Sequence, residues 1–353
     1  MENKIKLEEK SFLEKLLDYK APIFIFTGIA IRIFMLIYYY YIHAIDPSRG
    51  WGDVELNFIP TYLYPSLSMI LLEIFIALSF GSVEVFAFWA FSFDMLISLM
   101  FYFVIKSFDM PKKEYVFGLF LINPFLFLNN VFSLENCGYH ITDSFFFLFL
   151  FLSLIFYPKK EIKNRYLFYI FLSLSIASKW YPLPAIAFFF LKYLIEKDWR
   201  EMKIFLISTV PVLFSFLILP IFFWEEYFSM YLIWENRAAA FTPFYIRILP
   251  VAIISILFLI FRLKKADPME IIFVSIVAMV SFMFFSVPFI RYFQPLIFYG
   301  ILKTKEFFTI NLDLKFIKRK IIFDNNLLVF YLSIIACGLA YLLIIFILEP
   351  TPF

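Results

Sequence analysis

Residues 45–68 read IDPSRGWGDVELNFIPTYLYPSLS and form the first long polar stretch in a chain otherwise dominated by apolar runs. Asp46, Asp53 and Glu55 fall within ten residues of this stretch, and Trp51 and Tyr64 accompany them. Carboxylates held at a membrane surface are costly, and residues of this kind mark functional sites. The stretch therefore predicts a binding or catalytic site, with a solvated loop between two membrane spans as the alternative.

The rest of the chain has the composition of a protein embedded in lipid. Of its 353 residues, 63% are hydrophobic, 54 are phenylalanine and only 8 are glycine. Soluble domains are not so apolar, and runs of about 17 to 25 apolar residues are long enough to cross a bilayer. The glycines match no phosphate-binding loop, and no polar segment could hold a nucleotide-binding domain. We therefore expect an integral, multi-pass membrane protein that binds no nucleic acid.

The apolar runs predict an all-α polytopic membrane protein with about 11 transmembrane helices. The expected spans are residues 22–42, 83–105, 115–132, 141–157, 166–180, 182–195, 204–224, 244–261, 271–288, 293–302 and 327–348. Residues 67–80 are apolar but short and contain Glu73, so we expect an interfacial or re-entrant helix there. The first outer loop would then carry an interfacial helix.

The distribution of positive charge predicts the orientation. This count of spans puts 25 of the 31 Lys and Arg residues on one side, which the positive-inside rule identifies as the cytosol. The N-terminus is then cytosolic. We expect a cytosolic amphipathic helix over residues 1–21, a transmembrane module over 22–303, a cytosolic basic loop over 304–326 and a final transmembrane helix over 327–353. The expected location is the plasma membrane of a prokaryote, with an archaeon favoured, or the endoplasmic reticulum membrane in a eukaryote.

Most of the unusual polar residues fall at the outer ends of the expected spans. Arginine and lysine are suited to phosphate recognition, and aromatic neighbours fit an interfacial site. Interface anchoring is the alternative for each cation. The candidates on this face are His140, Lys179, Tyr181, Arg237, Tyr245, Arg247 and Arg291.

Two lone charges, Arg32 and Asp94, lie within expected spans and predict a buried structural ion pair. His43 and His140 lack further ligands at metal-binding spacing, so we expect no metal centre of histidines. No cofactor is expected, although Asp53 and Glu55 leave a divalent cation open.

Several stretches occur in the same order in one known family. They are Asp53-Val54-Glu55, residues 61–67 (TYLYPSL), Asn123-Pro124, 133–144 (SLENCGYHITDS), 179–182 (KWYP) and 237–245 (RAAAFTPFY). In order and spacing they resemble the GT-C class of membrane glycosyltransferases, and within it the PIG-M type catalytic subunit of GPI mannosyltransferase I. The resemblance covers residues 22–303. The family has DxD where this chain has DVE, and its first outer loop is longer.

The resemblance implies an inverting transferase that moves a hexose, expected to be mannose, from a polyprenyl(dolichyl)-phosphate sugar to a lipid-linked acceptor on the outer or lumenal face. Asp53 would be the general base, and Glu55 would assist it. The residues implied to bind substrate are Tyr64, His140, Lys179, Tyr181, Arg237, Tyr245, Arg247 and Arg291. A small membrane subunit is a further candidate partner.

Two other functions are compatible with the sequence. One is a multispan transporter or flippase of a lipid-linked saccharide, against which the chain shows no inverted repeat. The other is a non-catalytic subunit that keeps the GT-C-like fold.

Overall fold

The computed structural model describes residues 12–47, 64–123, 140–159, 161–239, 242–286, 294–303, 310–314 and 319–323. These residues are almost entirely helical, with one two-stranded hairpin. The helices are α1 (Phe12–Ile45), α3 (Ser66–Leu78), α4 (Val83–Ser107), α5 (Lys113–Leu121), α7 (Ile141–Phe156), α8 (Ile162–Ser178), α9 (Pro184–Glu196), α10 (Trp199–Phe222), α11 (Trp224–Ala239), α12 (Phe244–Phe261), α13 (Pro268–Ser286) and α14 (Gln294–Lys303). A short 3-10 turn, η1 (Leu263–Lys265), connects α12 to α13.

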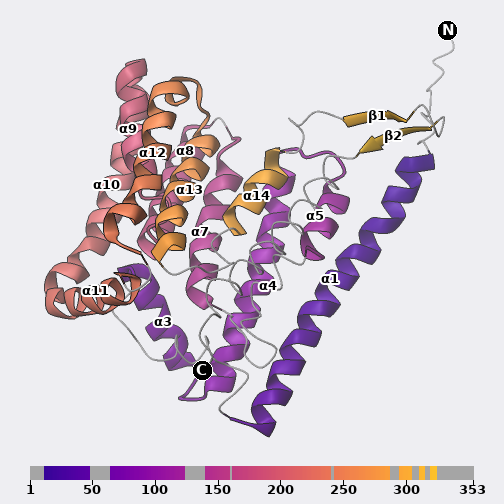
Figure 1. Cartoon of the computed structure of the whole chain (residues 1–353), viewed down its shortest axis with the longest axis horizontal. Helices are drawn as coiled ribbons and strands as arrows, with labels where there is room; N and C mark the ends of the chain where they lie inside the picture. The colour runs from indigo at the N-terminus through magenta and orange to yellow at the C-terminus, as the bar shows by residue number, and fades with distance from the viewer. Residues whose placement is uncertain are drawn as a thin grey trace.

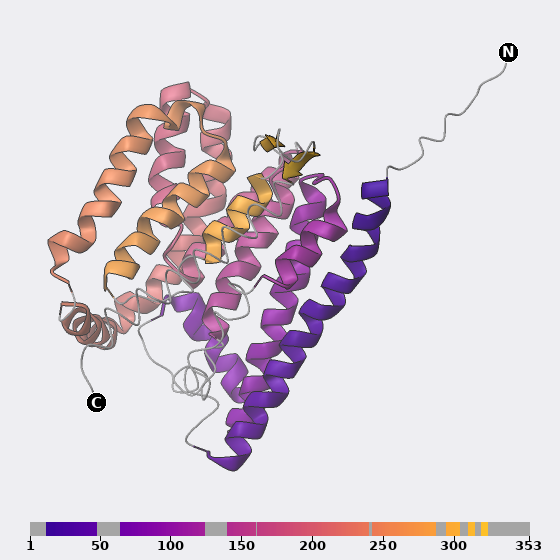
Figure 2. The same cartoon turned by 45° about the vertical axis from the view of Figure 1, so that its right-hand side comes forward.

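The long helices run side by side as a bundle (Figures 1 and 2). Helix α1 packs on α5, α4 on α7, α7 on α8 and α8 on α10, while α13 packs on both α9 and α12. Two helices depart from this arrangement. Helix α3 contacts α8, α10, α4 and α7, and α11 lies across the lower end of the bundle next to α10 (Figure 1).

The sequence predicted where most helices lie. Helix α12 has the expected bounds, and α4 begins at the expected residue, Val83. Residues 12–20 and the first span form one continuous helix, not a separate surface helix that ends at residue 21. Helix α5 ends at Leu121, well before the expected end of its span at 132, because Pro124 cannot continue a helix. Residues 124–139 lie outside the described part.

The described residues include four helices that are long and apolar enough to cross a membrane, at residues 20–45, 83–107, 199–222 and 244–261. Three shorter apolar helices occupy 66–78, 141–156 and 268–283. This pattern supports a multi-pass membrane protein. Helices α5, α9 and α14 have only 9, 13 and 10 residues, whereas about 20 are needed to span the hydrocarbon core. The total of eleven spans, and the final span at 327–348 outside the described part, remain predictions.

The basic ends of the helices meet at one end of the bundle, as the charge pattern predicted. Arg165 of α8 forms an ion pair with Glu201 of α10. Lys192 of α9 donates a hydrogen bond of 3.3 Å to the carbonyl of Lys264 in η1. This end lies opposite α11 (Figure 1). The alternation of these helices is therefore confirmed, and the assignment of this end to the cytosol remains a prediction.

The predicted ion pair between Arg32 and Asp94 is confirmed. The Arg32 Nε lies 3.6 Å from the Asp94 Oδ2, and only 2% of Arg32 is exposed. Arg32 also donates a hydrogen bond of 2.6 Å to the carbonyl of Leu121, at the C-terminal end of α5. Terminal carbonyls of a helix need such donors where water is excluded. Arg32 therefore joins α1, α4 and α5.

Glycine and phenylalanine account for much of the packing. A Cβ on Gly28 would lie 2.5 Å from the Cβ of Leu121, so α1 approaches α5 closely only because residue 28 has no side chain. Phe298 of α14 sits among aromatic rings of α4 and α7, with centroid distances of 4.8 Å to both Phe101 and Phe151. These rings form part of one large apolar core. Other phenylalanines face outward, where lipid is expected.

Two elements were not predicted. Residues 224–239 were expected to be an outer loop, but they form α11, whose glutamates make the segment too polar to be predicted as a span. Residues 304–326 were expected to be a basic loop, and within them β1 (Ile310–Leu314) and β2 (Arg319–Phe323) pair antiparallel, with Ile310 opposite Phe323. The hairpin lies near the N-terminal end of α1 (Figure 1).

Candidate functional site

The turn between α8 and α9 carries Lys179, one of the cations predicted to bind phosphate. Helix α8 ends at Ser178, and the Lys179 backbone is extended, with φ −155° and ψ 132°. The Lys179 ammonium forms an ion pair with Asp143 of α7 and lies 5.2 Å from the ring centroid of Tyr181. The two charged side chains are only 13% and 15% exposed. The structure thus brings Lys179 and Tyr181 together, as predicted, and it adds Asp143.

Asp143 lies in the first turn of α7, whose N-cap residue is His140. The helix dipole favours a carboxylate there, by about 0.3–1 kcal/mol at exposed positions. The preceding residue, Thr142, is fully buried, and its hydroxyl has no hydrogen-bond partner among the described residues. Buried hydroxyls are rarely left unpaired. The start of α7 therefore combines a cation partner, a helix N-terminus and an unused hydroxyl.

Helix α3 is held against this turn by a serine. Ser68 is fully buried and donates a hydrogen bond of 2.7 Å to the carbonyl of Ser178, the last residue of α8. In a continuing helix that carbonyl would accept from the N–H of residue 182, but residue 182 is proline and has no N–H. Ser68 supplies the missing donor. This hydrogen bond joins the start of α3 to the end of α8.

A second serine of α3 makes the same kind of contact with α10. Ser66 donates a hydrogen bond of 2.6 Å to the carbonyl of Phe216. The residue four positions after Phe216 is Pro220, which again lacks the N–H that the helix would use. In lipid, such freed carbonyls are satisfied by neighbouring helices. The N-terminal turn of α3 thus completes the hydrogen bonding of two proline-interrupted segments.

These contacts fix the end of the first outer loop. Tyr64 lies just before Pro65, the N-cap residue of α3, and packs, half-buried, against an apolar cluster that includes Leu72 and Phe86. The structure places Tyr64 at this cluster, and its role in substrate binding remains a prediction. Asp53 and Glu55 lie earlier in the same loop, outside the described residues.

Arg247 was predicted to bind substrate, and the structure gives its guanidinium a partner within the protein. Arg247 is fully buried in α12 and forms a two-pronged ion pair with Glu235 of α11, with one N–O distance of 3.0 Å. It also lies 5.5 Å from the ring centroids of both Phe244 and Phe282. In this conformation Arg247 joins α11 to α12 and α13.

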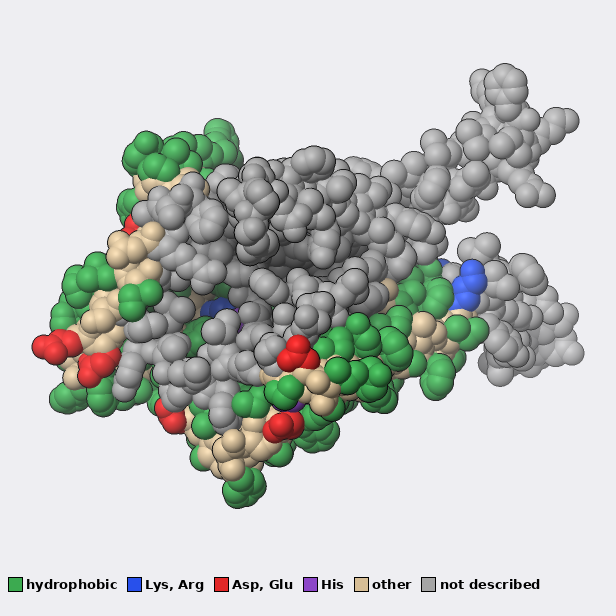
Figure 3. Space-filling model, turned by 60° about the horizontal axis from the view of Figure 1, so that its bottom comes forward, with side chains coloured by type: hydrophobic (Ala, Val, Ile, Leu, Met, Phe, Trp, Pro, Cys, Tyr) green, Lys and Arg blue, Asp and Glu red, His purple; other side chains and the backbone are tan. Residues whose placement is uncertain are grey.

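The remaining predicted residues are not brought to Lys179 by the described structure. Tyr245 lies in the first turn of α12 and is 70% exposed. Arg237 belongs to α11, but its side chain lies outside what the structure describes, as does the whole of Arg291. Figure 3 shows the face around the lower ends of α1, α4 and α11, where acidic side chains are exposed and a basic side chain lies in a hollow near the centre.

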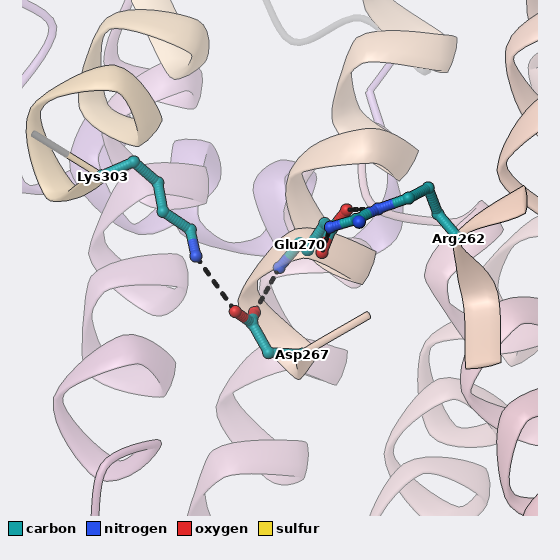
Figure 4. Close-up of polar contacts among 4 residues, drawn as sticks. All are labelled: Arg262, Asp267, Glu270 and Lys303. Carbon is teal, nitrogen blue, oxygen red and sulfur yellow. Dashed lines mark hydrogen bonds and ion pairs between the residues drawn. The ribbon is translucent and has the colours of Figure 1, made fainter. Parts of the chain in front are cut away.

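At the opposite end of the bundle, described charged residues make contacts between helix ends (Figure 4). Asp267 accepts a hydrogen bond of 2.8 Å from the backbone N–H of Glu270 at the start of α13, and Lys303 of α14 lies 3.1 Å from its other oxygen. Arg262 makes two hydrogen bonds to Glu270, of 2.9 and 3.1 Å, which raise the pKa of Arg262. These pairs join α12, α13 and α14.

Within the described residues, no group of three or more His, Cys, Asp or Glu side chains is placed to hold a metal ion. Comparisons with protein-family models, with curated proteins and with solved structures found no match to this chain. The function must therefore be argued from the site.

Proposed function

We propose that the chain is a membrane glycosyltransferase of the GT-C class. It would transfer a hexose, expected to be mannose, from a polyprenyl-phosphate sugar to a lipid-linked acceptor. The observation that carries the proposal is the hydrogen bond from Ser68 to Ser178, because it fixes the end of the acidic first outer loop beside Lys179. Transfer away from a phosphate needs both a carboxylate base and a cation for the departing charge.

The proposed reaction is a single displacement. Asp53 accepts the proton of the acceptor hydroxyl, and Glu55 assists it. The hydroxyl oxygen forms a bond to the anomeric carbon on the face opposite the phosphate, which inverts the configuration. The bond between that carbon and the phosphate oxygen breaks, and its electron pair stays on the phosphate. Polyprenyl phosphate leaves with one additional negative charge, which Lys179 stabilises.

The proposed donor fits the side of the membrane on which these residues are expected. Nucleotide sugars are cytosolic, so a transfer at the outer face needs a donor that arrives through the lipid. Tyr181 and His140 would border the phosphate, and Tyr64 would lie toward the acceptor. Arg237, Tyr245 and Arg291 remain proposed substrate contacts on the same face, whereas Arg247 supports α11.

The test is a transfer assay. Membranes that contain the protein are incubated with radiolabelled polyprenyl-phosphate mannose and a native lipid extract, and label in the lipid product is measured. We expect Asp53→Asn and Lys179→Met to lose at least about a hundredfold in rate, since each removes a group that acts in the transition state. Glu55→Gln should have a smaller effect.

Asp267→Asn is the matched control, because Asp267 pairs with a lysine at the opposite end of the bundle. It should transfer label at the wild-type rate. If wild-type protein transfers no label, or if both Asp53→Asn and Lys179→Met leave transfer unchanged, the proposal is wrong. Movement of intact donor across the membrane without transfer would favour a flippase.

A further inference from the structure

The ion pair between Lys179 and Asp143 lies where it contributes little to stability. Both side chains are more than four-fifths buried, at the outer end of two adjacent helices. A buried ion pair of this kind is frequently no more stabilising than apolar side chains of similar volume, because both charges lose their hydration. Phe146 packs edge-on against Tyr181, with 5.4 Å between the ring centroids, so apolar side chains in place of the ion pair would have apolar neighbours to pack against. A role in ligand binding explains the pair better than stability does.

A cation that awaits an anionic ligand in a partly buried site needs a counter-ion. An ammonium left alone there loses its hydration without a compensating charge, which is costly. Asp143 meets this need within the chain. The first turn of α7 favours a negative charge, so Asp143 keeps a favourable interaction when Lys179 takes another partner. The Thr142 hydroxyl, one residue earlier, has no hydrogen-bond partner among the described residues and is a donor for the incoming anion.

We infer that Asp143 is a displaceable counter-ion that competes with the lipid phosphate for Lys179. This inference rests on the proposed function and specifies how its phosphate site is filled and emptied. The donor is a phosphodiester with one negative charge, and the product is a phosphate monoester with up to two. Lys179 attracts the more highly charged product more strongly than the donor. When Asp143 pairs with Lys179 again, it offsets this attraction and so promotes release of the product. Asp143 is a positioning residue, not a catalytic one.

The structure contains a matched pair for comparison. Lys303 and Asp267 also form a lysine–aspartate pair between two helix ends, 3.1 Å apart, but at the opposite end of the bundle (Figure 4). Asp267→Asn therefore makes the same chemical change as Asp143→Asn, away from the proposed phosphate site.

The test measures equilibrium binding of a fluorescent polyprenyl monophosphate, without sugar, to purified protein in lipid nanodiscs. We expect Asp143→Asn to bind it about tenfold or more tightly than wild type, because a charge that competes at contact distance is removed. Lys179→Met should bind at least about tenfold more weakly. The double variant should match Lys179→Met, and Asp267→Asn should match wild type. In the transfer assay, Asp143→Asn should show a lower kcat and stronger inhibition by polyprenyl phosphate.

The inference is wrong if Asp143→Asn binds the monophosphate no more tightly than wild type, or if its gain persists when Lys179 is methionine. Asp143→Ser provides a second neutral variant should the asparagine protein fail to fold, and gel filtration checks both. The two proposals fail in different ways. Binding that follows this pattern without any sugar transfer would overturn the glycosyltransferase and keep the exchange at Lys179. Transfer with unchanged binding in Asp143→Asn would do the reverse.

Discussion

Ser68→Ala removes the hydrogen bond that holds α3 against the end of α8. The lost bond is 2.7 Å long and fully buried, and the proline at residue 182 leaves the carbonyl of Ser178 without a helical donor. A buried carbonyl left unpaired costs about 1–3 kcal/mol. We therefore expect a lower midpoint of thermal unfolding, measured by the loss of the monodisperse gel-filtration peak after heating.

The same substitution should reduce sugar transfer by about tenfold or more, because small displacements of positioned groups cost large factors in rate. Ser66→Ala is the control, since it removes a similar bond of 2.6 Å from the same turn of α3, but to α10 and not to the turn that carries Lys179. It should lower stability to a similar degree and lower transfer much less. Equal losses of transfer in the two variants, or wild-type stability in Ser68→Ala, would refute this reasoning.

Three other substitutions test the packing of the bundle. Gly28→Val places a Cβ 2.5 Å from the Cβ of Leu121, so α1 and α5 should move apart and the midpoint of thermal unfolding should fall. An unchanged midpoint would contradict the close contact of these helices. Reversing the charge of either Arg32 or Asp94 should abolish expression of folded protein. Exchanging the two residues should restore only part of the expression, because aspartate at position 32 cannot donate a hydrogen bond to the Leu121 carbonyl. Full recovery by the exchange would show that the contact with this carbonyl is dispensable. Glu235→Leu leaves the fully buried Arg247 guanidinium without its carboxylate and should lower the free energy of unfolding by about 3–5 kcal/mol in a denaturation assay. A decrease below about 1 kcal/mol would mean that water or another group replaces the carboxylate.

The positions of the helices were predictable because an apolar run long enough to cross a membrane can be recognised from the local sequence alone. Helix α12 was predicted to the residue for this reason. The pair of Arg32 and Asp94 was predictable as well, since a charge in the middle of an apolar helix needs a partner, and these two lie in the middle of α1 and α4. Helix α11 was missed because its glutamates make it too polar for a span. Its apolar residues at 224, 227, 228 and 231 follow helical spacing, and this is the signal that could have found it.

The contacts within the site depend on tertiary structure, and the sequence alone holds only part of their signal. Asp143 begins one helix and Lys179 ends the next, so antiparallel neighbours put them at one level. The rotation of each helix, which decides whether the side chains meet, is set by packing. The contact of Ser68 with Ser178 has a signal in the proline at residue 182, which frees a carbonyl. The proline indicates that the Ser178 carbonyl needs a donor, but it does not indicate that Ser68, 110 residues earlier, supplies it.

The most direct test of the central claim, that the acidic outer loop and Lys179 share one site, is crosslinking across that site. Glu55→Cys and Lys179→Cys are combined in a chain whose Cys137 and Cys337 are replaced by serine, and the purified protein is treated with a short bifunctional maleimide. We predict an internal crosslink, detected by mass spectrometry. Lys179→Cys combined with Asp267→Cys, at opposite ends of the bundle, should give none. A failure of the first pair to crosslink, although each cysteine reacts singly, would contradict the account.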